Sequence, residues 1–123
     1  MLPSKRILTV SRDRTLQLSR TLLLEDAGYS VIELSTDLSV ASFLALRSHP
    51  ELALVLMCHS VPEKSRLAMC AVIKRVYPET PILMLYNGND PTLARVDARL
   101  ENMWNPQALV ETIGVLLSGA AAN

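Results

Sequence analysis

The chain has 123 residues, with 12 Lys or Arg against 12 Asp or Glu, so its formal net charge is zero. This balance argues against a general nucleic-acid-binding surface, which needs a clustered basic excess, and gives little attraction to an anionic membrane. No apolar run could span a bilayer and the first residues lack the core and cleavage site of a signal peptide, so we expect a soluble cytoplasmic protein without membrane or nucleic-acid partners.

Short apolar runs typical of buried strands alternate with longer runs of helical periodicity. The first half is predicted to hold a strand at 6–10, a helix at 15–27, a strand at 29–34 and a helix at 38–48. The second half is predicted to hold a strand at 51–57, a helix at 63–77, a strand at 81–86, a short helix at 91–98, a strand at 99–103 and a helix at 106–118. Gly28 and Pro50 end the first two helices, and Pro106 suits the first turn of the last.

Two of these helices carry further information in their apolar residues. The helix at 63–77 is amphipathic, and we expect its basic residues, Lys64, Arg66, Lys74 and Arg75, to face solvent, opposite Leu67, Ala68, Ala71, Val72 and Val76. The helix at 106–118 has more apolar residues than one buried stripe requires. The surplus suggests a partner helix in a homodimer, and the alternative is that one or two aliphatic side chains are simply exposed.

The regular alternation of strands and helices predicts right-handed βαβ units and a parallel sheet that is covered on both faces. Five strands and five helices in this length match a flavodoxin-like, doubly wound α/β fold with strand order 2-1-3-4-5 and helices on both faces. We expect one domain over residues 1–123, with a disordered tail at 119–123. Ligands of such sheets bind at the carboxyl ends of the strands, which here brings residues 11–13 beside residues 58–60.

Several segments resemble the receiver domains of response regulators, and together they cover nearly the whole chain. They are RILTV before a polar turn, LLLEDAGYSVIEL, LVLM and HSVP on either side of Cys58, TPILMLYNG and NPQALVETIGVLL. Receivers accept a phosphoryl group on an aspartate, and the resemblance implies that Cys58 stands at that position, with the family's proline kept as Pro62. It also implies a shortened fourth helix, since few residues separate Tyr86 from Asn102.

The resemblance further implies that every chemical position of the family is replaced. The acidic pair that holds Mg²⁺ matches Ser11 and Arg12, and the hydroxyl residue after the fourth strand matches Tyr86. The lysine after the fifth strand matches Asn102, and the aromatic switch position on that strand matches Arg99. Mg²⁺ prefers oxygen ligands that include carboxylates, whereas this pair offers one weak ligand and one cation.

Phosphorylation at Cys58 is therefore not expected. Without a metal and a lysine, nothing neutralises the charge that develops during phosphoryl transfer. Asp13 follows the replaced pair, where the start of a turn can aim its carboxylate elsewhere. We expect neither a metal nor a cofactor, although a conventional single-domain receiver that uses an unaligned acid such as Asp13 stays open as an alternative.

Three residues of this degenerate site allow two interpretations each. Arg12 either fills the metal space, paired with Asp13 or with backbone carbonyls, or points into solvent. Tyr86 either fills the phosphoryl space or keeps its hydroxyl in water. Cys58 is interpreted as a small buried residue, and the alternative is a redox-sensing thiol that Arg12 activates.

The remaining polar and aromatic residues carry no separate function in the sequence. His59 is interpreted as a solvated loop histidine without a catalytic partner. Ser60 lacks the sequence context of a hydrolase nucleophile. Cys70 is expected to pack in the core, and Trp104 either packs against the last helix or anchors an interface.

These observations favour a non-enzymatic pseudo-receiver that works through protein–protein contact and not through phosphorylation. The resemblance implies two-component signalling as its context, with a kinase, a regulator or an output protein as partner. A conventional response regulator with an atypical acceptor and a redox sensor built on Cys58 are the alternatives.

Overall fold

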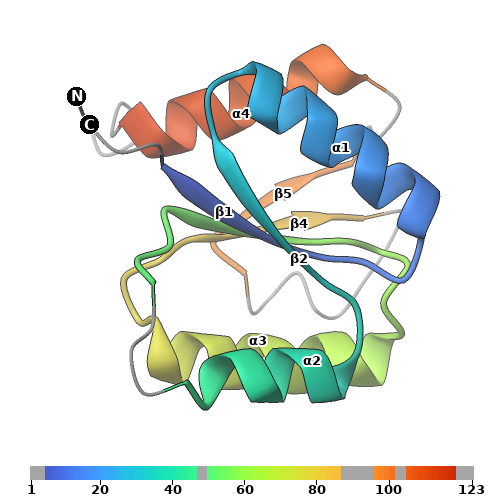
Figure 1. Ribbon diagram of the computed structural model, residues 1–123, viewed down its shortest axis with the longest axis vertical. Helices are drawn as coiled ribbons and strands as arrows, with labels where there is room; N and C mark the ends of the chain where they lie inside the picture. The colour runs from blue at the N-terminus through green and yellow to red at the C-terminus, as the bar shows by residue number, and fades with distance from the viewer. Residues whose placement is uncertain (1–4, 47–49, 87–95, 102–104, 119–123) are drawn as a thin grey trace.

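The computed structural model describes residues 5–46, 50–86, 96–101 and 105–118 (Figure 1). Its strands and helices, in chain order, are β1 (Arg6–Val10), α1 (Arg14–Asp26), β2 (Ser30–Leu34), α2 (Asp37–Leu44), β3 (Leu54–Met57), α3 (Glu63–Val76), β4 (Ile82–Leu85), β5 (Ala98–Leu100) and α4 (Pro106–Ser118).

The five strands form one sheet in the predicted order, β2-β1-β3-β4-β5, and all neighbouring strands run parallel. Every residue of β3 and of β4 is buried, which is why these strands are unbroken apolar runs. Val10 pairs with Met57 at the ends of β1 and β3. The chain therefore continues from both strands at one edge of the sheet, at the point where the strand order reverses.

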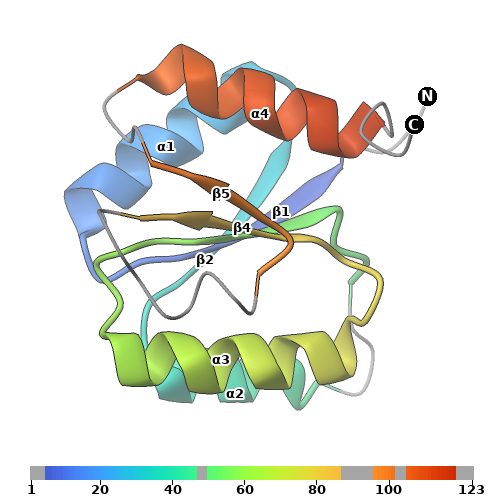
Figure 2. The same ribbon diagram turned by 180° about the vertical axis from the view of Figure 1, so that it is seen from behind.

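The helices cover both faces of the sheet, as predicted: α1 and α4 lie on one face, and α2 and α3 lie on the other (Figures 1 and 2). Alternate strand residues face the two resulting cores, as the two-residue period of a strand requires. The core beside α2 and α3 includes Leu8, Phe43, Val55, Ile73 and Met84. The core beside α1 and α4 includes Ile7, Leu24, Leu56, Leu83 and Ile113.

Local signals set the ends of the first two helices. Asp13 caps α1 by accepting a hydrogen bond from the Leu16 amide at 3.0 Å. Gly28 follows the end of α1 with a φ of 100°, a conformation that favours glycine. Thr36 and Ser39 form a reciprocal capping box that fixes the start of α2.

Several predicted boundaries are wrong by a few residues. β3 begins at Leu54 and not at residue 51, and α2 ends at Leu44 and not at residue 48. The predicted short helix at 91–98 falls mostly on residues 87–95, outside the described residues. Its last residue, Ala98, opens β5 instead, because it pairs with Leu83 in the parallel sheet. The tail at 119–123 also lies outside the described residues.

The side chains that α1 and α3 bury are not those that hydrophobicity alone indicates. The α1 residues Leu18 and Leu22 are 56% and 59% exposed, whereas α1 buries Gln17, Arg20, Thr21 and Leu24. In α3 the expected solvent-facing Arg66 is buried, while Ala68, Ala71 and Val72 are exposed. Both helices therefore direct polar groups at the sheet, where these groups have hydrogen-bond partners.

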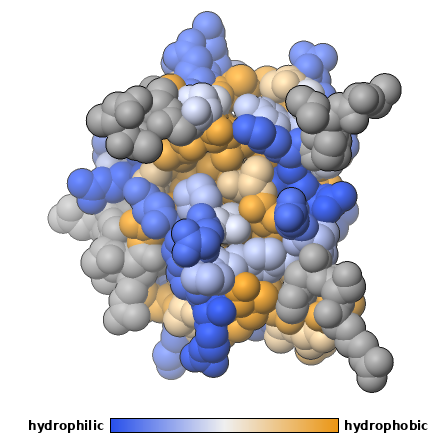
Figure 3. Space-filling view, turned by 90° about the vertical axis from the view of Figure 1, so that its left-hand side faces the viewer, coloured by the Kyte–Doolittle hydropathy of each residue, from blue (hydrophilic) through white to orange (hydrophobic). Residues whose placement is uncertain are grey.

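The amino ends of the strands lie on the opposite side of the molecule from the loops that were predicted to carry the functional residues. Figure 3 views the molecule from the side at which β1 begins, where polar and apolar residues are mixed. There the Lys5 ammonium donates to the Leu117 carbonyl at 3.1 Å and ties the start of the sheet to the end of α4. The loops predicted to carry the functional residues leave from the other edge. No helix in the described ranges has the length and apolar character that crossing a bilayer requires.

Candidate functional site

Two serine hydroxyls join the loops that follow β1 and β3. The Oγ atoms of Ser11 and Ser60 lie 3.1 Å apart, and Ser11 is fully buried. Ser60 Oγ also accepts the amide of Arg12 at 2.9 Å and the amide of Asp13 at 3.3 Å. Ser60, which the sequence left without a role, thus acts as the link that holds the two loops together at the switch point.

Cys58, which the resemblance aligns with a phosphoacceptor, has a buried arginine beside it. The Arg20 guanidinium reaches down from α1 and donates to Cys58 Sγ at 3.4 Å. Arg20 is only 7% exposed and Cys58 only 1% exposed. No carboxylate of the described residues lies within ion-pair distance of Arg20. We call the residues Ser11, Arg20, Cys58 and Ser60 the Cys58 site.

The Cys58 site keeps its thiol in the neutral form. Burial raises the pKa of Cys58, and the positive charge of Arg20 opposes that rise without cancelling it. A neutral thiol is a poor nucleophile, because the thiolate is the reactive species. The cation that acts on the thiol is Arg20, and not Arg12 as the sequence suggested.

The residues that the resemblance aligns with the metal ligands of receivers do not fit Mg²⁺. The Ser11 hydroxyl already bonds to Ser60 and to the Asp13 carbonyl, and Asp13 uses its carboxylate as the cap of α1. Arg12 turns towards the start of α2, where its Nε donates to the Ser35 carbonyl and its Nη2 lies 3.0 Å from an Asp37 carboxylate oxygen. Arg12 thus pairs with a backbone carbonyl, as one interpretation expected, but its carboxylate partner is Asp37 and not Asp13, and the residue is exposed. Within the described ranges, no three His, Cys, Asp or Glu side chains come close enough to hold a metal ion.

Tyr86 and Arg99, which the resemblance also aligns with the family's chemistry, are not part of the Cys58 site. Tyr86 is partly buried against the core beside α2 and α3, whereas Cys58 belongs to the core on the opposite face of the sheet. Arg99 is the exposed central residue of β5, in register with Met84. Asn102 lies outside the described residues. The structure therefore brings Cys58 together with Ser11, Ser60 and Arg20, and not with Tyr86.

His59 and a second buried arginine complete the loop after β3. The Arg66 guanidinium donates to the carbonyls of His59, at 3.0 Å, and of Val61, and so fixes the loop from α3. His59 is half-buried, and its Nδ1 is buried without a hydrogen-bond partner in the part of the chain that the structure describes, so the interpretation as a solvated histidine holds only in part. Burial lowers the pKa of His59, and the charges of Arg20 and Arg66 lower it further. The imidazole is therefore held neutral.

The architecture defines the class of fold, a flavodoxin-like, doubly wound sheet of the kind found in receiver domains. No family model matches the sequence, and no curated protein matches it significantly. Solved structures match it closely in shape. The signal receiver domain of a signal transduction histidine kinase from Syntrophus aciditrophicus has a TM-score of 0.78 at 22% identity, with 94% of this chain and 92% of that chain covered.

Two further solved structures agree over nearly the full length of both chains. A chemotaxis response regulator of Vibrio cholerae has a TM-score of 0.77 at 21% identity, with 94% of this chain and 100% of that chain covered. The signal receiver domain of an HD domain-containing protein from Pseudomonas fluorescens has a TM-score of 0.78 at 19% identity, with 98% and 100% covered. The chain therefore has the receiver-domain fold.

Proposed function

We propose that this protein is a pseudo-receiver, a non-enzymatic member of the receiver family that acts in cytoplasmic two-component signalling through protein–protein contact and without phosphorylation. A signalling kinase, a regulator or an output protein is the class of partner. The similarity of its fold to receiver domains supports the family, and the degenerate chemistry of the site supports the loss of phosphorylation.

The observation that carries this proposal is the pairing of Arg20 with Cys58. The phosphoacceptor of a receiver is an accessible carboxylate, whereas here a neutral thiol is buried under a guanidinium. Asp13, the acid whose charge acts on Cys58, accepts the Leu16 amide and caps α1. Phosphorylation of Asp13 would therefore disturb the charge-assisted bond that caps the helix.

The test is incubation of the purified protein with acetyl phosphate and Mg²⁺, followed by intact-protein mass spectrometry. We expect no added phosphoryl mass, with an active receiver of similar size as the positive control for the reagent. A phosphoryl adduct that disappears in Asp13→Asn would refute the proposal and establish the conventional receiver. An adduct that persists in Asp13→Asn and disappears in another Asp or Glu variant would refute it equally.

The redox alternative finds no support in the same geometry. A redox-sensing cysteine needs an accessible thiolate, and Cys58 is buried with a raised pKa. Mild peroxide followed by mass spectrometry should leave Cys58 and Cys70, which is also buried, equally unmodified.

A homodimer through α4 stays a prediction. Leu109 and Ile113 face the core, and Val115 is 51% exposed beside Glu111 and Thr112. Sedimentation velocity of the protein and of Val115→Glu tests it, since a dimer through α4 should dissociate in the variant.

A further inference from the structure

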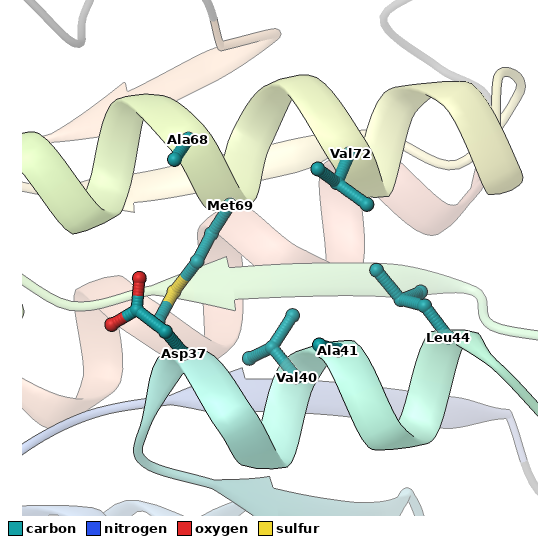
Figure 4. A pocket seen from close by; sticks show the side chains of 7 residues that line it. All are labelled: Asp37, Val40, Ala41, Leu44, Ala68, Met69 and Val72. Atoms are coloured by element: carbon teal, nitrogen blue, oxygen red, sulfur yellow. The ribbon is translucent and has the colours of Figure 1, made fainter.

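A groove runs between α2 and α3 on the face of the molecule away from α1 and α4 (Figure 4). Side chains of the two helices approach each other across it, from Val40, Ala41 and Leu44 on one helix and from Ala68, Met69 and Val72 on the other. Asp37 lies at one end of the groove. The lining is otherwise apolar.

The size of the groove indicates what it can hold. Its volume is about 90 Å³. Small-molecule sites usually enclose on the order of 300–1,000 Å³. The groove therefore suits one aliphatic or aromatic side chain of a partner better than a metabolite.

Outside the lining of the groove, α2 and the residue after its C-cap expose two leucines and no free charge. Leu38 is 76% exposed and Leu46, just beyond the helix, is 49% exposed. The only ionisable residue of α2 is Asp37, and its carboxylate already accepts from Arg12 at 3.0 Å and from the Ser65 hydroxyl at 2.9 Å. A partner therefore meets no uncompensated negative charge on this side.

The α3 side carries a basic residue near each end of the groove. Lys64, Ala68, Val72 and Arg75 recur at helical spacing along one exposed face of α3. Lys64 and Arg75 are eleven positions apart, which is roughly 16 Å along a helix. Neither forms an ion pair with another described residue. Glu63 lies about 100° round the helix from Lys64, off this face.

We propose that the groove between α2 and α3 docks an acidic amphipathic helix of a partner protein. One apolar side chain of that helix enters between Ala41 and Val72, its apolar stripe covers Leu38, and its carboxylates pair with Lys64 and Arg75. The exposed aliphatic area of Leu38, Leu46 and Val72 is small beside the roughly 800 Å² per partner of a stable interface. The groove thus suits a short helix in a transient complex better than a second copy of this chain.

This inference deepens the proposed role as a docking module, and it names the class of partner. A labelled synthetic helical peptide with a leucine stripe flanked by glutamates serves as the acidic probe. The basic probe is the same peptide with lysine in place of each glutamate. Fluorescence anisotropy should show that the acidic probe binds at least tenfold more tightly, and amide chemical shifts should change along α2 and α3.

Variants of the groove and of its rim make the test specific. Val72→Glu should weaken binding of the acidic probe at least tenfold, and Ala68→Gln should do so by filling the groove without a charge. Each of Lys64→Glu and Arg75→Glu should weaken it about fivefold, as expected for exposed charge pairs. Leu22→Glu, at an exposed aliphatic residue of α1 on the other face of the sheet, is the control and should bind as the unchanged protein does.

Every other outcome overturns the proposal. Equal binding of both probes, unchanged binding by folded Val72→Glu, or no binding by either probe would each refute an acidic helical partner. Self-association that Val72→Glu abolishes and Val115→Glu keeps would assign the groove to a second copy of this chain. The acetyl phosphate experiment tests the proposed function separately from the docking site. If the protein becomes phosphorylated and still prefers the acidic probe, the pseudo-receiver proposal is refuted and the docking site is not.

Discussion

The link between the two loops at the switch point can be broken by Ser60→Ala. Ser60 Oγ is the only hydrogen-bond partner that the structure gives the Arg12 amide, at 2.9 Å, among the described residues. The Asp13 amide also donates to Ser11 Oγ at 3.1 Å, and Ser11 keeps its bond to the Asp13 carbonyl. Two of the three interactions of Ser60 therefore have partial replacements, and water can reach the exposed Arg12.

The expected cost of Ser60→Ala follows from these replacements. A net hydrogen bond contributes roughly 0.5–1.5 kcal/mol, so the variant should lose about 1–2 kcal/mol of the free energy of unfolding. For a domain of this length that corresponds to a fall in Tm of about 4–8 °C. Urea and thermal unfolding followed by circular dichroism measure both quantities.

Ser19→Ala is the matched control for Ser60→Ala. Ser19 is an exposed residue of α1, and alanine there should leave stability unchanged or raise it slightly through helix propensity. A loss below about 0.5 kcal/mol in Ser60→Ala, close to the effect of a typical surface substitution, would show that Ser60 does not hold the loops together and would refute the reasoning.

Three further predictions concern His59 and Cys58, whose ionisation is shifted. The pKa of His59 is lowered, so the folded state is favoured above the ordinary histidine pKa, where the imidazole is neutral, and it loses this stability as pH falls. The urea midpoint should therefore drop between about pH 7.5 and about pH 5.5, and the drop should be smaller in His59→Gln. The pKa of Cys58 is raised, so its neutral thiol favours the folded state below the ordinary thiol pKa, and this stability is lost as pH rises through the higher pKa of the folded state. The urea midpoint should therefore fall above about pH 9, and it should fall less in Cys58→Ser. Arg20→Met should make Cys58 react still more slowly with a disulfide reagent at about pH 8.5, since Arg20 is the cation that lowers the thiol pKa; faster reaction of a folded variant would contradict this role.

The sheet was predictable because its information is local. Strands buried on both faces need unbroken apolar runs, and such runs alternate with helical periods along the whole chain. The handedness of βαβ units then limits the possible strand orders, and the match to the flavodoxin-like doubly wound arrangement predicted the observed one. The predicted ends of the strands were less accurate where pairing with a neighbouring strand decides them. Asp97 illustrates this, since its carboxylate accepts the Ile82 amide at 2.8 Å and lies 2.7 Å from the Lys74 ammonium, which anchors the start of β5.

The partners of Cys58 were predictable in part. Gln17, Arg20, Thr21 and Leu24 are spaced as i, i+3, i+4 and i+7, which is the pattern of a buried helical face. The pattern was missed because three of its members are polar and the leucines of α1 lie elsewhere on the helix. Ser60 had no comparable signal. Its role depends on how two loops 49 residues apart in sequence meet in space, which no local pattern encodes.

The buried guanidinium of Arg20 also bears on what an acidic residue could do at position 58. An aspartate introduced there would meet Arg20 in the same buried space, as an ion pair and not as a free nucleophile. Asp13 would still be committed to the helix start, and Arg12 to the turn before α2. Cys58→Asp alone would therefore not provide an accessible carboxylate, and the chemistry of this position depends on Arg20 as much as on the residue that occupies it.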